Sequence, residues 1–203
     1  MGRIVLATRN KGKIAELGAM LALHGVEVVG LEAFPEVGEV VEDGDTFEEN
    51  ARKKARAVAE ATGLVAVADD SGLEVDALGG APGVHSARYA GPGATDAANN
   101  AKLLAALAGV PEADRTCRFR CVMLARTPQG RELSAHGAWE GRVAGAPAGE
   151  GGFGYDPLFI DLASGRRAAE MAREEKNAVS HRGRALRALL AGWGGFLAGA
   201  GLE

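Results

Sequence analysis

Long apolar runs, an excess of positive charge and cysteine are scarce or absent in this chain of 203 residues. No stretch approaches the roughly 20 apolar residues of a membrane-spanning helix, so we expect no such anchor and no membrane partner. The formal net charge is −4, which argues against nucleic acid as a partner. The start lacks the plan of a signal peptide, and Leu6 stands where a myristoylation signal has Ser or Thr. We therefore expect a cytoplasmic protein.

Two familiar chemistries also lack their sequence signals. The only cysteines, Cys117 and Cys121, share a face of one predicted strand but lie too far apart along it to form a disulfide. We expect them to be buried small residues rather than a metal or redox site. Neither a Walker A loop nor a GxGxxG motif is present. Hydrophobic residues make up 47% of the chain, enough for a single domain over residues 1–203 with one substantial core.

What the sequence has instead is a pair of adjacent carboxylates after an apolar segment. Residues 64–68 predict a buried strand, and Asp69 and Asp70 follow it directly, ahead of Ser71 and Gly72. A further short strand is expected over residues 73–78. Acids where a strand ends lie at the edge of a sheet, where α/β proteins commonly bind ligands. We therefore expect these acids to hold a metal ion and to activate a water molecule.

The first strand, expected over residues 3–7, leads into a polar turn over residues 8–13 and then a helix with apolar periodicity to residue 23. Asn10 is the expected N-cap. Free backbone N–H groups, the helix dipole, Lys11 and Lys13 together suit an anion. A capped helix with two solvated lysines is the alternative interpretation.

A second strand is expected over residues 26–31, followed by an acidic loop and a helix. Residues 46–49 (TFEE) form a capping box, and Gly63 is expected to end the helix. Glu42 precedes this helix and is either a metal ligand or a surface acid. Three basic residues of the helix are expected to be solvated rather than near phosphate: Lys53, Lys54 and Arg56.

The middle of the chain predicts another helix and a hairpin. Thr95 caps a helix expected over residues 96–108, whose buried side would carry Ala97, Ala101, Leu104 and Leu107. Two strands follow over residues 116–127 and 131–143. They are longer than average, so they are expected to extend into a second lobe.

Residues 153–157 (FGYDP) place two aromatic rings and an acid in one turn, ahead of a short strand over residues 158–160. Such a turn suits a base pocket, in which the rings stack on the base and the acid or backbone binds its edge. A purely structural turn is the alternative. A last helix is expected over residues 174–192, with Lys176, Ser180 and Arg184 on one face by their spacing. Residues after Phe196 are expected to fray.

Six segments, in this order, resemble the inosine triphosphate pyrophosphatase family: residues 8–13, 45–51, 68–73, 79–89, 153–159 and 175–182. The resemblance runs from residue 4 to about residue 190. It implies an α/β fold with a long twisted mixed β-sheet flanked by helices, in two lobes with a nucleotide cleft between them, and a homodimer. It further implies Mg²⁺-dependent hydrolysis of deaminated purine nucleoside triphosphates (ITP, dITP and XTP) to the monophosphate and pyrophosphate, which cleanses the nucleotide pool.

The resemblance also implies a role for each matched residue. Asp70 would be the general base and a metal ligand, with Asp69 as a possible further ligand and Ser71 in contact with the substrate. Glu42 would be the second metal ligand, although Asp43 or Asp45 could take that place. The triphosphate would be bound by Thr8, Arg9, Asn10, Lys11, Gly12 and Lys13. The nucleotide, mainly its base, would be held by Phe153, Gly154, Tyr155, Asp156, Lys176, His181 and Arg182.

Two other functions remain open at this point. One is a Maf-like pyrophosphatase that acts on other modified nucleotides. The second is a nucleotide sensor without catalysis, although binding an anion does not need the two adjacent carboxylates.

Overall fold

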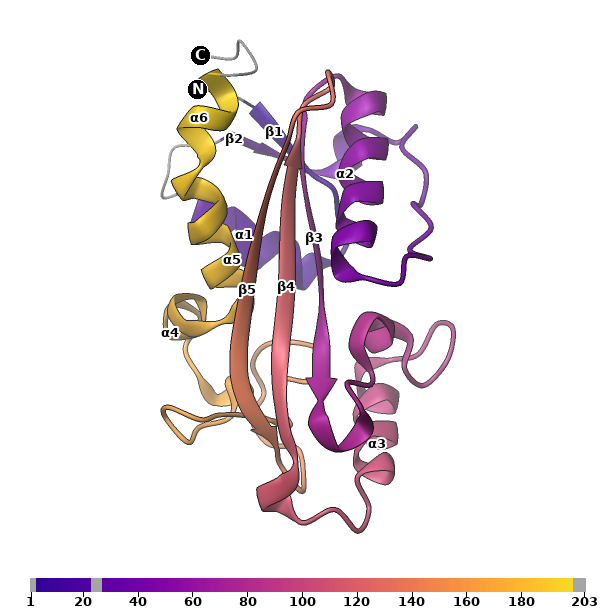
Figure 1. Cartoon of the computed structure of the whole chain (residues 1–203), viewed down its shortest axis with the longest axis vertical. Coiled ribbons are helices and arrows are strands. Elements are labelled where there is room, and N and C mark those ends of the chain that lie inside the picture. Colours follow the sequence, from indigo (N-terminus) through magenta and orange to yellow (C-terminus); the bar gives the residue numbers. More distant parts are fainter. Residues whose placement is uncertain (1–2, 23–26, 199–203) are drawn as a thin grey trace. The chain divides into compact units, whose positions relative to one another are not determined.

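The computed structural model describes residues 3–22 and 27–198, which form a six-stranded sheet flanked by helices (Figure 1). The strand order is β2-β1-β3-β4-β5-β6. Strand β1 is parallel to both β2 and β3, whereas β5 and β6 are antiparallel, so the sheet is mixed and the expected α/β class is confirmed. The strands are β1 (Arg3–Leu6), β2 (Glu27–Val29), β3 (Val65–Val75), β4 (Thr116–Arg126), β5 (Glu132–Val143) and β6 (Phe159–Asp161).

Side-chain caps start three of the helices at the positions predicted from the sequence. Asn10 Oδ1 accepts a hydrogen bond from the Lys13 backbone N–H, Thr46 does the same for Glu49, and Thr95 for Ala98. The helices are α1 (Lys11–Ala22), α2 (Phe47–Thr62), α3 (Asp96–Ala106), α4 (Arg173–Val179), α5 (His181–Ala191) and α6 (Trp193–Ala198).

The chain forms two compact units. Unit 1 comprises Met1–Asp70, Cys121–Gly137 and Arg182–Glu203, and unit 2 comprises Ser71–Arg120 and Ala138–His181. Strands β3, β4 and β5 contribute residues to both units. This was predicted from length for β4 and β5 but not for β3. The nucleotide cleft implied by the family resemblance stays a prediction.

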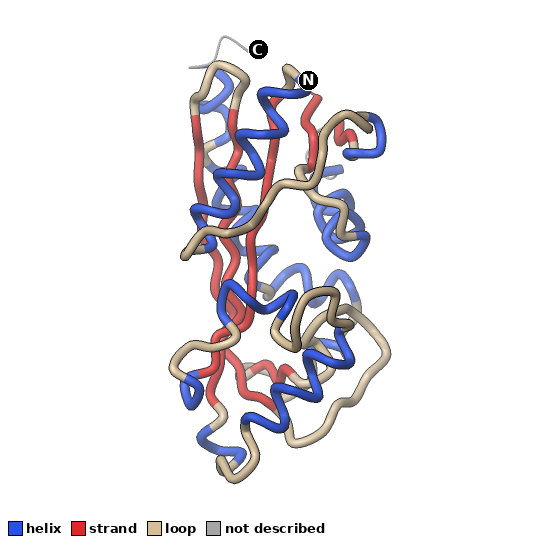
Figure 2. Tube along the Cα trace, turned by 90° about the vertical axis from the view of Figure 1, so that its right-hand side faces the viewer, coloured by secondary structure: helices blue, strands red, loops and turns tan. Residues whose placement is uncertain are grey.

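In unit 1 the sheet is covered by helices on both faces (Figures 1 and 2). Alternate residues of a strand point to opposite faces, and the two cores follow this rule. Ile4 and Val67 pack with α1, α5 and α6, whereas Val5 and Ala66 pack with α2. Residues that follow one another on β1 or β3 therefore face different helices, and this rule also governs the candidate site.

Unit 2 is built around one aromatic core. Phe119, Trp139 and Phe159 lie within 6.2 Å of one another, measured between ring centroids. Leu103 of α3 and Leu107, which follows the end of α3, belong to the same core. The Trp139 indole donates a hydrogen bond of 2.8 Å to Asp161, so this large ring is buried with its polar group satisfied.

Several boundaries differ from the sequence prediction. The last helix is interrupted at Ser180, whose backbone is extended (φ −68, ψ 158), so Lys176 and Arg184 do not share the face of one helix. The buried side of α3 carries Leu103, and Leu107 directly after the helix is also buried, while Ala97 and Ala101 are exposed. Residues Trp193–Ala198 form helix α6, because Phe196 is buried in the unit 1 core, and the residues after Ala198 that were expected to fray lie outside the described part of the chain. Leu23 and Val26, placed by the sequence in a helix and a strand, lie outside the described residues.

Candidate active site

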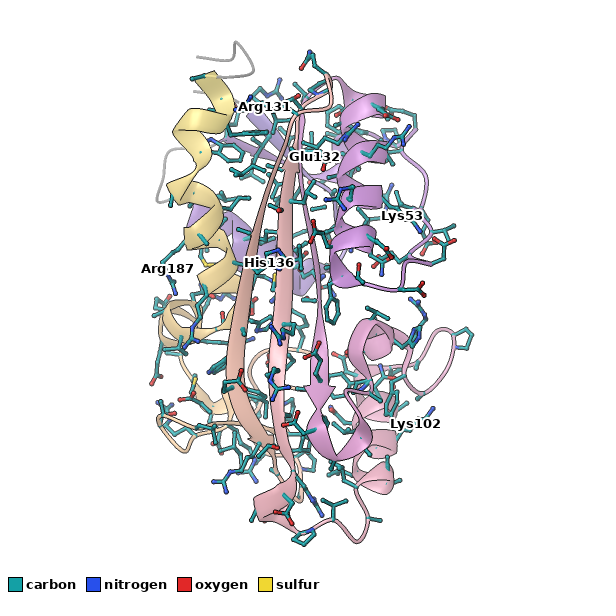
Figure 3. The ribbon with its side chains drawn as sticks, in the orientation of Figure 1. Lys53, Lys102, Arg131, Glu132, His136 and Arg187 are labelled. Carbon is teal, nitrogen blue, oxygen red and sulfur yellow. The ribbon has the colours of Figure 1, made fainter. Side chains whose placement is uncertain are left out.

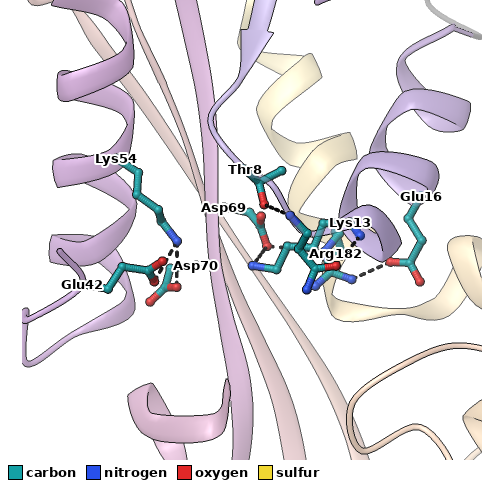
Figure 4. Close-up of polar contacts among 9 residues, drawn as sticks. Thr8, Lys13, Glu16, Glu42, Lys54, Asp69, Asp70 and Arg182 are labelled. Carbon is teal, nitrogen blue, oxygen red and sulfur yellow. Dashed lines mark hydrogen bonds and ion pairs between the residues drawn. The ribbon is translucent and has the colours of Figure 1, made fainter. Parts of the chain in front are cut away.

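Strand β3 carries Asp69 and Asp70 in its middle rather than at its end. The strand continues without interruption from Val65 to Val75, so the expectation that the acids end one strand and precede another is wrong. A strand tolerates two charges in its interior here because each carboxylate has an ammonium group within 2.9 Å. The two side chains point to opposite faces of the sheet (Figure 4).

Asp70 lies on the face covered by α2. Lys54 Nζ is 2.9 Å from Asp70 Oδ1 and 3.0 Å from Glu42 Oε2, so two carboxylates share one ammonium group. Lys54 is only 7% exposed, and the expectation that it is solvated is wrong. Lys53 points away from the sheet (Figure 3) and pairs with Asp43. Of the acids in this loop, Glu42 is therefore the one that shares a partner with Asp70.

The charges on this face shift both carboxyl groups. Burial raises the pKa of Asp70 to about 6, and the hydrogen bond with Glu42 acts in the same direction, against the attraction of Lys54 and Lys13. Burial also raises the pKa of Glu42, but Lys54 and the hydrogen bond with Asp70 outweigh it and hold that pKa below its usual range. Two close acids with one cation leave a negative charge that a metal cation would neutralise.

Asp69 lies on the face covered by α1 and α5. Its Oδ2 is 2.8 Å from Lys13 Nζ and 3.4 Å from Arg182 Nε, and Arg182 also pairs with Glu16. Burial acts to raise the pKa of Asp69, but Lys13 and Arg182 hold it well below its usual range. Two cations balance two anions here, so this face carries no charge deficit for a metal to fill.

The turn over residues 8–13 leads directly into α1, as predicted, and its role as an anion site stays a prediction. Thr8 Oγ1 accepts a hydrogen bond from the Asn10 backbone N–H, and α1 begins at Lys11, which is exposed beside half-buried Gly12. Arg9 behaves differently, because its guanidinium donates a hydrogen bond of 2.7 Å to the carbonyl oxygen of Val37. It thereby ties this turn to the loop that carries Glu42.

The turn over residues 153–156 belongs to unit 2. Asp156 Oδ2 accepts hydrogen bonds from the Phe153 backbone N–H (2.8 Å) and from Lys176 Nζ (2.6 Å). The Lys176 ammonium also lies 5.2 Å from the centre of the Phe153 ring. A Cβ atom on Gly152, which has a φ of +74, would lie 2.0 Å from Asp156 Oδ2. Only glycine fits there, because a larger residue would displace the Asp156 carboxylate that binds Lys176.

The two aromatic rings of this turn have different surroundings. Tyr155 is 5% exposed and its hydroxyl donates a hydrogen bond of 2.9 Å to the Ser86 carbonyl oxygen. The expectation that both rings are available to stack on a base is therefore wrong for Tyr155, because the unit 2 core encloses it. Phe153 is half-buried. Two further predicted substrate contacts lie outside this turn. The ring of His181 stacks on Phe119, with centroids 4.6 Å apart and an interplanar angle of 15°. Ser71 is a half-buried residue of β3.

Sequence reasoning overlooked two partners of the acids. Lys54 follows Ala51 by three residues and precedes Val58 by four, so the apolar periodicity of α2 already placed it on the buried side. Glu16 follows Lys13 by three residues and thus shares its side of α1. In both cases the helical spacing predicted the side of the helix on which the residue lies. It did not predict which residue, distant in the sequence, would be its partner.

The positions of the acidic side chains limit which of them could hold a metal ion. Within residues 3–22 and 27–198, no three His, Cys, Asp or Glu side chains gather as metal ligands. The pair Glu42 and Asp70 fits Mg²⁺, which commonly takes one or two carboxylates and fills its other positions with phosphate oxygens and water.

Burial raises the thiol pKa of Cys117 and of Cys121 to about 12, and both are buried, as expected. In the described part of the chain, no helix has the length and apolar character to cross a bilayer.

The mixed sheet, its flanking helices and the acid-bearing strand β3 define an α/β protein of one recognisable class. The chain belongs to the Ham1 family, whose model matches residues 4–192, and this confirms the resemblance found in the sequence. It is 64% identical over 202 residues to the dITP/XTP pyrophosphatase of Nitratidesulfovibrio vulgaris, covering 97% of this chain and 98% of that protein. The dITP/XTP pyrophosphatase of Geobacter sulfurreducens is 54% identical over 199 residues, covering 97% of this chain and all (100%) of that protein.

A solved structure agrees with these relatives. The HAM1 protein from Coxiella burnetii superposes with a TM-score of 0.83 at 46% sequence identity. The match covers 92% of this chain and 95% of that one. The fold is therefore that of Ham1 proteins over nearly the whole length.

Proposed function

We propose that this protein hydrolyses deaminated purine nucleoside triphosphates, namely ITP, dITP and XTP. The products are the nucleoside monophosphate and pyrophosphate, so the reaction removes such nucleotides before they enter DNA or RNA. The names of the relatives from N. vulgaris and G. sulfurreducens support this substrate class. The observation that carries the proposal is the shared ammonium of Lys54 between Glu42 and Asp70 on one face of β3.

Glu42 and Asp70 would hold Mg²⁺. When bound, this ion would neutralise charge on the phosphate oxygens, which is the main demand of phosphoryl-transfer chemistry. Asp70 would orient the attacking water and accept its proton. Asp69 has no spare charge for a metal, because Lys13 and Arg182 neutralise it. Its proposed role is to position these two cations.

The triphosphate would bind at the start of α1. Backbone N–H groups at a helix N-terminus and the positive end of its dipole favour an anion. Thr8, Asn10, Lys11 and Gly12 would bind phosphate oxygens, and Lys13 would neutralise the departing pyrophosphate. Arg9 is engaged with the Val37 carbonyl, so its contribution would be to hold the turn rather than to bind phosphate directly.

The base would be recognised by its ring and by its O6 oxygen. Phe153 would stack on the base, and Lys176 or Arg182 would donate a hydrogen bond to O6, with His181 and Ser71 as further substrate contacts. Adenine has an amino group at that position, so a buried donor facing it would stay unpaired. An unpaired buried group costs about 1–3 kcal/mol, which gives a preference for hypoxanthine and xanthine over adenine.

The remaining parts of the proposal concern the setting of the enzyme. We infer a homodimer that works in the cytoplasm and binds neither nucleic acid nor membrane. The net charge of −4 supports the absence of nucleic acid as a partner. Size-exclusion chromatography with light scattering would give the oligomeric state.

The decisive experiment incubates the purified protein with ITP and Mg²⁺ and separates the products. IMP and pyrophosphate are expected, in equal amounts, with ATP turned over far more slowly. IDP and phosphate would move the attack to the γ-phosphorus. Turnover of m⁷GTP or modified pyrimidine nucleotides in place of ITP would favour a Maf-like enzyme, and binding of ITP without turnover would indicate a sensor.

A further inference from the structure

Helix α3 is hydrogen-bonded to the turn that carries Phe153, although none of the six segments that carry the family resemblance includes α3. We propose that Asp96 and Asn100 are positioning residues. They bind the N–H and the carbonyl oxygen of Gly154 and thereby hold the neighbouring Phe153 ring in place for the base of the substrate. The inference rests on the proposed function, because it assumes that a base stacks on Phe153.

Two hydrogen bonds make this grip. Asp96 Oδ2 accepts a hydrogen bond of 2.7 Å from the Gly154 backbone N–H. Asn100 Nδ2 donates one of 3.0 Å to the Gly154 carbonyl oxygen. Residues four apart on a helix lie on the same side, one turn from each other, so the two side chains bracket a single residue of the turn. All three residues belong to unit 2.

The turn has a backbone hydrogen bond of its own, 3.3 Å from the Asp156 N–H to the Phe153 carbonyl oxygen, and the two side chains of α3 add to it. Gly154 has a φ of +63, a left-handed conformation that glycine adopts without a steric penalty but does not by itself hold. The Phe153 N–H is bound by Asp156 and the Gly154 N–H by Asp96. Both N–H groups next to the Phe153 ring are thus bound by side chains. Loss of Asp96 would leave the peptide between Phe153 and Gly154 with only the longer bond from the Asp156 N–H.

Helix α3 is a rigid support for such a task. Leu103 and Leu107 anchor it in the unit 2 core, and Thr95 caps its start. Asn100 is 9% exposed, so water does not compete strongly for its amide. A site held by side chains on a packed helix is positioned more precisely than one held by its own loop.

The neighbouring Asn99 offers a matched control. It is also buried, on the same turn of the same helix, but it bonds elsewhere: its Oδ1 accepts from the Ala90 N–H and its Nδ2 donates to the Ala87 carbonyl. Asn99→Asp and Asn100→Asp make the same chemical change and each removes one amide donor. Only the second removes a contact to Gly154.

The test compares steady-state kinetics of ITP hydrolysis with Mg²⁺ in the two variants. We expect Asn100→Asp to raise KM for ITP about tenfold more than Asn99→Asp does, with kcat within about twofold, because base contacts contribute equally to the ground and transition states. Inhibition by tripolyphosphate, which has no base, is expected to be unchanged. Asp96→Ala should act like Asn100→Asp, while Asp96→Asn, which keeps an acceptor oxygen, should restore a near-normal KM.

Three results would overturn the inference. These are equal KM values for Asn99→Asp and Asn100→Asp, a parallel loss of tripolyphosphate binding, and a normal KM for Asp96→Ala. Asp96 is exposed, so Asp96→Ala remains a fair test if Asn100→Asp does not fold. A wild-type protein without ITP turnover would reject the proposed function, whereas an active wild type with indifferent Asp96 and Asn100 variants would reject only the positioning role.

Discussion

The two faces of β3 treat neighbouring carboxylates in opposite ways. On one face Asp69 is neutralised by Lys13 and Arg182, and its pKa is held well below its usual range. On the other face Asp70 and Glu42 share Lys54, and the pKa of Asp70 is raised to about 6. A strand thus separates a charge-balanced cluster from one that lacks a cation. We therefore expect substitution of Asp69 to act mainly on stability and substitution of Asp70 to act mainly on catalysis.

The largest effect is expected from Asp70→Asn. The variant keeps the shape of the side chain but loses the proposed base, so kcat for ITP should fall by about 10²–10⁴. Unfolding by urea should be little changed or shifted to higher concentration, because the replacement removes one of two close acids. Asp43→Asn, which alters an acid paired at the surface with Lys53, is the control and should keep full activity. Near-normal turnover of a folded Asp70→Asn protein would refute the assignment.

Asp69→Asn should show the converse pattern in stability. Removal of one partner from a buried ion pair leaves an uncompensated charge, which typically costs about 3–5 kcal/mol. Lys13 and Arg182 would both lose a partner, so the urea midpoint should fall well below that of Asp70→Asn. Activity should also drop, because Lys13 would no longer be held. Equal midpoints for the two variants would show that the faces do not differ as the charges indicate.

The contrast between the faces was only partly predictable from the sequence. The mixed α/β fold, the caps at Asn10, Thr46 and Thr95, and the acidic pair all follow from local patterns. The opposite orientation of the two acids would have followed from strand alternation, but two consecutive charges suggested that the strand ends there. Whether a strand can continue through charges depends on distant cations, and Arg182 stands 113 residues from Asp69 in the sequence.

Lys54→Met tests whether the Asp70 face lacks a cation. The variant removes the ammonium group that Glu42 and Asp70 share, so its melting temperature without metal should fall. Added Mg²⁺ binds the folded state and stabilises it, by about 2.7 kcal/mol at a hundredfold excess over Kd. We therefore expect Mg²⁺ to raise the melting temperature of Lys54→Met more than that of the wild type.

The matching change on the other face is Lys13→Met. It also removes an ammonium group from a buried acid, at 2.8 Å from Asp69. Mg²⁺ should not restore its melting temperature, because Arg182 still neutralises Asp69. If Mg²⁺ raised the melting temperatures of both variants equally, the metal would not be specific to the Asp70 face, and the prediction would be wrong.

The smallest effect is expected at Arg9, which connects the phosphate-binding turn to the loop that carries Glu42. Arg9→Met removes the hydrogen bond to the Val37 carbonyl, an interaction worth about 0.5–1.5 kcal/mol. If Arg9 holds Glu42 in place for a metal, the Mg²⁺ concentration for half-maximal activity should rise about threefold while KM for ITP at saturating Mg²⁺ stays the same. If Arg9 binds phosphate instead, KM for ITP should rise and the Mg²⁺ dependence should not change. The two outcomes separate a residue that supports the Asp70 face from one that touches the substrate.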